Sequence, residues 1–144
     1  MSAPPLRPPA VRGILETALH VEDVERSRDF YAALFGLPVM LGDHRFCALD
    51  VAGRDVLLLF QKGGTAEPVT IPGGVIPGHD GEGRLHLAFA VHRDELDAWE
   101  ARLRERSIEI EGRVTWERGG RSIYFRDPDG HLLELATPGL WPNY

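Results

Sequence analysis

The sequence predicts an α+β fold of two βαβββ modules, in which each sheet curves into a half-barrel around a concave cleft. Two observations support this prediction. The order strand, helix and three strands occurs twice, on either side of a segment rich in Gly and Pro. In both copies, the first strand alternates between an apolar face and a face of small or polar residues. This pattern is typical of a sheet that covers a core on one side and lines a cleft on the other.

The first copy begins with a strand expected at 13–21. Asp23 is placed to cap a helix, and Gly36 is placed to end it. Ala52-Gly53 is expected to form the turn between the last two strands. The remaining extended segments of this module are expected at 38–41, 45–51 and 55–61.

The second copy begins with a strand at 84–91, and Asp94 is the expected cap of its helix. Asp127-Pro-Asp-Gly130 is a strong turn signal between the last two strands. The segment 62–84 has no convincing periodicity and is expected to be a long loop. The extended segments that complete the second module are expected at 108–110, 121–126 and 131–136.

The composition fits one globular domain: of 144 residues, 43% are hydrophobic and 26% are charged. The net charge of -6 argues against nucleic-acid binding, and no apolar run reaches the ~20 residues of a membrane span. The N-terminal segment lacks the pattern of a signal peptide, and Cys47 is the only cysteine, so a cytoplasmic location is expected. The expected division of the single domain 1–144 is module one at about 11–62, loop 63–83, module two at about 84–137 and tail 138–144.

Three polar residues on the expected cleft faces suggest a metal site. Counting back from the ends of the first strands makes Glu16 and His86 equivalent positions, and Glu134 lies on the same face of the last strand. One imidazole and two carboxylates suit a divalent transition metal and leave positions open for water or substrate. The alternative is that these groups satisfy one another in a hydrogen-bond network. Ala18, His20 and Ala88 share this face and are expected to line the pocket.

Two motifs resemble the vicinal oxygen chelate superfamily, which includes glyoxalase I, extradiol dioxygenases, fosfomycin-resistance enzymes and bleomycin-resistance proteins. One motif runs from Gly120 to Leu135 and contains Asp127-Pro-Asp-Gly130. The other is Asp23-Val-Glu-Arg-Ser-Arg-Asp-Phe-Tyr31, followed by Leu34-Phe-Gly36-Leu. The resemblance covers about residues 13–137 and implies this glyoxalase-like fold.

The resemblance also implies roles for individual residues. It places the metal ligands at Glu16, His86 and Glu134, although the first is a histidine in several members of the superfamily. A fourth ligand, as in glyoxalase I, is missing because its position falls at Leu58 or Leu59. The repeat register favours Glu16 over His20 as the ligand of the first strand. Further expected site residues are Tyr124, which could donate to an oxyanion, His79 as a loop acid or base, and Ser122 in the substrate pocket.

The resulting functional hypothesis is a metal-dependent enzyme that chelates two neighbouring oxygens of a small substrate. A lyase, an isomerase, an epoxide-opening enzyme and a ring-cleaving dioxygenase all fit this scheme, with Mn, Fe, Ni or Zn as the metal. A homodimer is expected by analogy. Fosfomycin resistance is not predicted, because the basic residues that hold a phosphonate have no clear counterpart here. The alternative is a metal-free protein of the bleomycin-resistance type that sequesters a drug.

Overall fold

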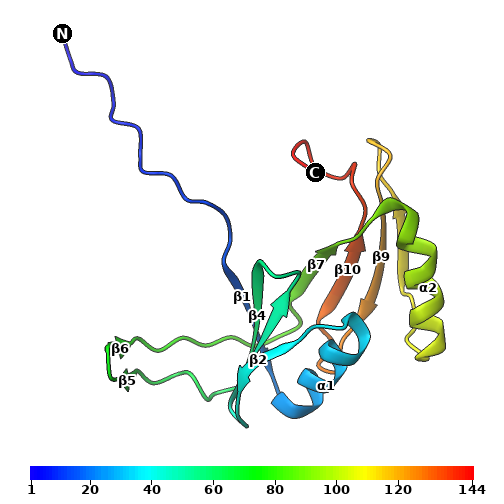
Figure 1. Cartoon of the computed structure of the whole chain (residues 1–144), viewed down its shortest axis with the longest axis horizontal. Coiled ribbons are helices and arrows are strands. Elements are labelled where there is room, and N and C mark those ends of the chain that lie inside the picture. Colours follow the sequence, from blue (N-terminus) through cyan, green and yellow to red (C-terminus); the bar gives the residue numbers. More distant parts are fainter.

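The computed structural model describes residues 1–144 and contains two four-stranded sheets, two α-helices and a separate hairpin (Figure 1). The strand order is β1-β4-β3-β2 in one sheet and β7-β10-β9-β8 in the other. Each sheet therefore has a parallel pair at one side and antiparallel pairs elsewhere. This arrangement confirms the α+β fold of two βαβββ modules. The sheets remain open and do not close into barrels.

The first module follows the predicted local signals closely. Asp23 caps α1 (Val24–Phe35) by accepting a hydrogen bond from the backbone N–H of Arg26, and Gly36 ends the helix in the left-handed conformation at φ 68°. Ala52 and Gly53 both have positive φ in the turn between two strands. The strands are β1 (Glu16–Val21), β2 (Val39–Gly42), β3 (Phe46–Val51) and β4 (Asp55–Gln61).

The second module corrects two details of the sequence prediction. Asp94 does not cap a helix, because it lies inside the 3-10 turn Arg93–Glu95 that leads directly into α2 (Leu96–Glu105). The extended segment expected at 108–110 is not a strand, and the edge strand of this sheet is β8 (Gly112–Thr115) instead. The other strands are β7 (His86–Ala90), β9 (Arg121–Arg126) and β10 (Leu132–Ala136).

The strand registers show how closely the two modules correspond. Glu16 pairs with Val56 and Ala18 with Leu58, while His86 pairs with Leu132 and Ala88 with Glu134. If Glu16 and His86 are equivalent, Leu58 is the first-module counterpart of Glu134. The structure thus decides between the two leucines left open by the sequence.

One hydrophobic core joins the modules. Fifteen buried residues from both sheets and both helices form a single cluster. The hydroxyl of Tyr31 on α1 donates to the Asp127 carboxylate of the β9–β10 turn at 2.7 Å, and both groups are buried. Asp129 in the same turn accepts from the backbone N–H of Glu22 at 2.9 Å. Leu19 and Val21 of β1 are buried in this core, whereas Leu15, which precedes the first paired residue of β1, is exposed.

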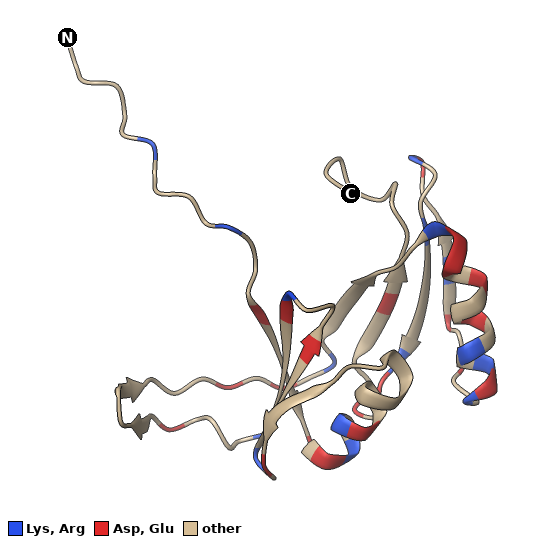
Figure 2. Ribbon diagram, in the orientation of Figure 1, with Lys and Arg blue, Asp and Glu red and all other residues tan.

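The segment expected to be an irregular loop contains a hairpin that projects from the first module (Figure 1). Its strands, β5 (Val69–Ile71) and β6 (Gly74–Ile76), pair with each other and with no other strand. They carry no charged residue, whereas charges of both signs are interspersed along α1 and α2 (Figure 2). β-branched residues around Pro72-Gly73 are the signal that could have predicted the hairpin. Neither α-helix has the length and apolar character needed to cross a bilayer.

Candidate functional site

His86 and Glu134 form the centre of the candidate site on the second sheet. The Nε2 atom of His86 lies 3.2 Å from Oε1 of Glu134, across the parallel pairing of β7 and β10. Glu134 is only 4% exposed, whereas half of the His86 side chain is open to solvent. The Glu134 carboxylate is therefore buried against the sheet, and solvent reaches the pair from the side of His86.

The hydrogen bond of the other imidazole nitrogen determines what His86 presents to Glu134. Its Nδ1 lies 2.9 Å from the carbonyl oxygen of Leu132, and because a carbonyl only accepts, Nδ1 carries the proton and donates. In a neutral imidazole, Nε2 is then an acceptor that faces a carboxylate oxygen. Two acceptors this close require a proton or a cation between them.

This donor set fits a divalent metal ion. Nitrogen and oxygen ligands bound tetrahedrally to one zinc ion at about 2.0–2.2 Å lie roughly 3.3–3.6 Å from each other. The separation of Nε2 and Oε1, 3.2 Å, is close to this range. The carbonyl that fixes the His86 tautomer is the kind of outer partner found around metal-binding histidines.

A chain of hydrogen bonds holds the second oxygen of Glu134. The Ser122 hydroxyl donates to Oε2 at 2.5 Å, and Nε1 of Trp116 donates to Ser122 Oγ at 2.8 Å. Ser122 was predicted from the sequence as a pocket residue, and the structure buries it beneath the carboxylate. Trp116, directly after β8, was not predicted, because nothing in the local sequence indicates the reach of its side chain.

Tyr124 also lies at this site. It is the cross-strand partner of Glu134 in the β9–β10 ladder, and its ring stacks near that of His86 with centroids 6.4 Å apart. Burial raises the pKa of the Tyr124 hydroxyl, and the charge of the Glu134 carboxylate raises it further. The hydroxyl therefore keeps its proton at neutral pH and remains a hydrogen-bond donor.

Glu16 stands apart from these residues within the chain. No group of three or more His, Cys, Asp or Glu side chains lies close enough together to hold a metal ion. Glu16 and Ala18 are exposed on β1, and Ala88 is exposed on β7 beside Glu134. The structure thus brings two of the three predicted ligands together and leaves the third on the open face of the other sheet.

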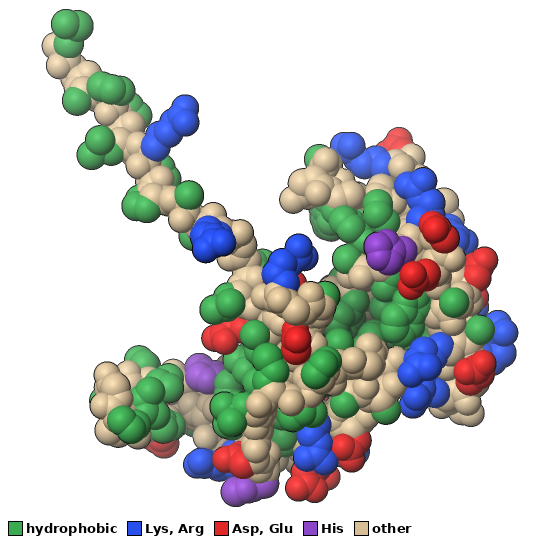
Figure 3. All heavy atoms as spheres, in the orientation of Figure 1, with side chains coloured by type: hydrophobic (Ala, Val, Ile, Leu, Met, Phe, Trp, Pro, Cys, Tyr) green, Lys and Arg blue, Asp and Glu red, His purple; other side chains and the backbone are tan.

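An apolar cleft lies between the modules. It has a volume of about 360 Å³, and the space-filling view shows hydrophobic side chains in the hollow between the two halves (Figure 3). Ten of its thirteen lining residues are hydrophobic, which suits a small, partly apolar molecule. Ala88 and Ala90 extend the lining to the strand that carries His86. The others include Ile14, Leu15, Leu57 and Phe89.

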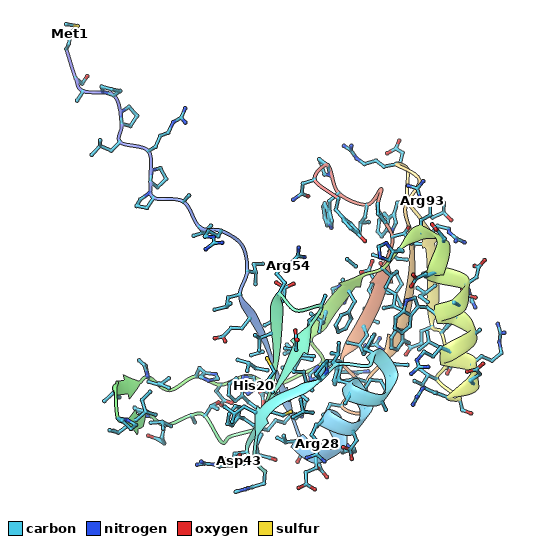
Figure 4. The ribbon with its side chains drawn as sticks, viewed as in Figure 1. Met1, His20, Arg28, Asp43, Arg54 and Arg93 are labelled. Atoms are coloured by element: carbon cyan, nitrogen blue, oxygen red, sulfur yellow. The ribbon has the colours of Figure 1, made fainter.

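His20, which is labelled in Figure 4 near the base of the hairpin, belongs to a second cluster. Its neighbour in this cluster is His79. Their ring centroids are 5.5 Å apart, and both rings pack against Phe60. His20 is buried, and its Nδ1 has no hydrogen-bond partner. Burial lowers the pKa of His20, and the neighbouring His79 lowers it further, against the opposing effect of Asp80. The two rings contact each other and Phe60 of β4, and the His20 carbonyl lies 2.9 Å from Nε2 of His131. Neither histidine joins His86 and Glu134.

Known proteins resemble this chain over nearly its whole length. The family model for the Glyoxalase/Bleomycin resistance protein/Dioxygenase superfamily matches residues 13–135. The metallothiol transferase FosB of Shouchella clausii (strain KSM-K16) is 32% identical over 133 residues, which make up 90% of this chain and 83% of that protein. The FosB of Lysinibacillus sphaericus (strain C3-41) is 32% identical over 132 residues, or 90% and 85% of the two chains.

A solved structure shows the same fold at similar sequence identity. The crystal structure of lactoylglutathione lyase from Agrobacterium tumefaciens superposes with a TM-score of 0.83 at 31% identity. The match covers 94% of this chain and 99% of that one.

Proposed function

Because the chain belongs to the Glyoxalase/Bleomycin resistance protein/Dioxygenase superfamily, we propose that it is a metal-dependent enzyme whose divalent cation chelates two oxygens of a small substrate. His86 and Glu134 would hold the metal, with Glu16 as the third protein ligand. The observation that carries the proposal is the 3.2 Å distance between His86 Nε2 and Glu134 Oε1, which in a neutral imidazole with a proton on Nδ1 are two facing acceptors. A cation bound between the two atoms would offset the repulsion between their lone pairs.

We further propose that Glu16 reaches the site from a second copy of the chain. Glu16 is exposed on β1, and His86 is open on the face where a third ligand is needed. Large apolar side chains are also exposed just before β1 and on the hairpin, and such surface is typically covered in an assembly. A homodimer that buries this surface would complete two identical sites. The exposed apolar residues are Ile14, Leu15, Val69, Ile71, Val75 and Ile76.

The residues around the metal ligands suit chemistry at a substrate oxygen. When bound, the metal supplies a Lewis acid that stabilises negative charge on the chelated oxygens. Tyr124 keeps its proton and can donate a hydrogen bond to a developing oxyanion. The apolar cleft beside Ala88 would hold the rest of the substrate and exclude water. Because the Ser122 hydroxyl donates to Glu134, Ser122 would hold the carboxylate in place more than it would bind the substrate.

Among the possible reactions, we favour a lyase or a group transfer without net oxidation. The FosB relatives are named metallothiol transferases, and the solved relative is named a lyase. A ring-cleaving dioxygenase would consume oxygen. Oxygen uptake by the Fe²⁺-loaded protein with catechol as a probe would move the proposal to the dioxygenase class.

The decisive experiment measures metal content by elemental mass spectrometry. We expect near-stoichiometric metal in the wild type, and loss of metal in Glu16→Ala, His86→Ala and Glu134→Ala. His20→Ala is the matched control, because it removes a histidine that lies beside His79, in the cluster separate from His86 and Glu134. If the wild type binds no Mn, Fe, Ni or Zn after incubation with each, the metal-dependent proposal fails. The metal-free, ligand-sequestering function would then be the better one.

Size measurement of the same proteins tests the origin of Glu16. A dimeric wild type that loses metal on dilution to monomer would support a site shared between copies. A monomer that keeps its metal would contradict it, and would require Glu16 to be replaced by water or by another group.

A further inference from the structure

We infer that Ser122 and Trp116 are positioning residues that orient the Glu134 carboxylate for metal binding. The inference rests on the proposed metal-dependent function and extends it to two residues that do not themselves contact the metal. It is based on a hydrogen-bond chain from the indole N–H of Trp116 through Ser122 to Glu134.

The chemistry of the three groups fixes the direction of this chain. An indole N–H can only donate, so the Ser122 oxygen must accept from Trp116. The single hydroxyl proton of Ser122 is then committed to Oε2 of Glu134, at 2.5 Å. Because this bond turns Oε2 toward Ser122, Oε1 is the oxygen that faces His86. The chain thus selects which carboxylate oxygen is presented to a ligand.

The surroundings hold both positioning residues in place. Ser122 is 1% exposed and lies on β9, an inner strand of the sheet, where it pairs with Ala136 of β10 on one side and Val114 of β8 on the other. Trp116 follows β8 in a tight turn. Its backbone N–H donates to the Gly120 carbonyl at 2.7 Å, and its backbone carbonyl accepts from the N–H of Gly119 at 2.9 Å. The donor end of the chain is therefore anchored by the backbone, which limits rotation of the Glu134 carboxylate.

Removing the hydroxyl of Ser122 should weaken metal binding without removing a ligand. Loss of an outer partner typically lowers metal affinity by about 10–100-fold. We expect an effect of this size for Ser122→Ala. Trp116→Phe keeps one aromatic ring and loses the indole N–H together with the five-membered ring, and its effect should lie at or below the roughly 10-fold end of the same range. Ser122→Thr retains the hydroxyl and should restore most of the affinity.

Ser27, elsewhere in the protein, provides a matched control. This serine is also buried, and its hydroxyl donates to a carboxylate, Asp129, at 3.2 Å, but it lies on α1 in the contact between modules. Ser27→Ala therefore deletes the same chemical group from a similar environment. It should lower the stability of the fold and leave metal affinity unchanged.

The test is a titration of metal-free wild type and the four variants with Zn²⁺, by calorimetry in the presence of a competing chelator. The Co²⁺ absorption spectrum of each protein provides a second readout, because it responds to the geometry of the ligands and not to global stability. We expect weaker Zn²⁺ binding and an altered Co²⁺ spectrum in Ser122→Ala, recovery in Ser122→Thr, and wild-type behaviour in Ser27→Ala.

The outcomes separate this inference from the proposed function. Normal Zn²⁺ binding by wild type together with unchanged affinity in Ser122→Ala and Trp116→Phe would overturn the positioning role and leave the metal site intact. If Ser122→Ala does not fold, unchanged affinity in Trp116→Phe is sufficient to overturn it. A wild type that binds neither ion would overturn the metal site and the positioning role with it.

Discussion

The two modules share a backbone plan and differ in the chemistry of their open faces. In the second module, His86 and Glu134 face each other at 3.2 Å, with Ser122 behind the carboxylate. At the equivalent positions the first module has Glu16, which is exposed, and Leu58, which cannot bind a metal. The first module instead has a buried imidazole, His20, covered by the loop that carries His79.

This difference shows which face of each sheet is free to change. The face toward the helices must remain apolar in both modules, because both contribute to one core. The opposite face contributes little to that core, so its side chains can differ between the copies without loss of the fold. One face therefore preserves the repeat, while the other determines which module carries the candidate chemistry.

Substitutions in the core of each module test most severely whether the two modules depend on each other. Leu59 and Leu135 occupy equivalent positions and are both fully buried. We expect Leu59→Ala and Leu135→Ala each to lower the free energy of unfolding by about 2–5 kcal/mol. Because the core is shared, each variant should still unfold in a single transition in chemical denaturation.

Leu6→Ala, at an exposed position of the N-terminal segment, serves as the control and should have no measurable effect. Two separate unfolding transitions in either core variant would contradict a single core that joins the modules.

The contact between the modules is the next feature to test. Tyr31 donates to the buried Asp127 carboxylate, and burial together with that charge holds the pKa of Tyr31 well above its ordinary value. Tyr31→Phe leaves the carboxylate without this donor and should cost about 1.5–3 kcal/mol, the range for hydrogen bonds to charged groups. Tyr144→Phe, whose hydroxyl donates to the neutral carbonyl of Ala136, should cost only about 0.5–1.5 kcal/mol. Equal losses in thermal or urea unfolding would show that charge and burial at Tyr31 add nothing.

A weaker effect is expected on the pH dependence of stability, through His20. Its pKa in the folded chain lies below the ordinary value of 6.5. Above pH 6.5 both folded and unfolded states are neutral at this residue, so it adds no pH dependence. As the pH falls below 6.5, the unfolded chain binds a proton that the folded chain resists. The free energy of unfolding then decreases, by at most about 1.4 kcal/mol per pH unit, until the folded pKa is passed.

His20→Phe removes this titration and fills the same aromatic cluster beside Phe60. We expect urea unfolding between pH 7 and pH 5 to show a smaller loss of stability in His20→Phe than in wild type. His44→Phe, at an exposed position, should follow the wild-type curve. Parallel curves for wild type and His20→Phe would rule out the proposed effect of burial.

Local signals explain why much of the fold could be predicted. Asp23, Gly36 and Asp127-Pro-Asp-Gly130 act through bonds to residues a few positions away, so their effect is visible in the sequence. The prediction failed at Asp94, where a 3-10 turn replaces the cap, and in the segment of the hairpin. In that segment, several Gly and Pro residues obscured two strands of only three residues each.

The candidate site was predicted in part. Strand alternation placed His86 and Glu134 on one face, and the parallel register of β7 and β10 brings them into contact. The separation of Glu16 and the burial of His20 could not be foreseen, because both depend on how whole segments pack. Trp116 joins the site through a side chain that crosses from one strand end to the next strand, a distance that sequence spacing does not encode.

The repeat, the helix caps, the turns and the apolar faces of the strands follow from the sequence, because each depends on residue type and on neighbours along the chain. Which acceptor atoms meet, which carboxylate oxygen is held, and which histidine is buried depend on contacts between residues distant in sequence. Those contacts form only when both modules pack on one core. The tertiary structure therefore distinguishes the module with the candidate metal site from the module that shares its backbone and its apolar core face but has no such pair.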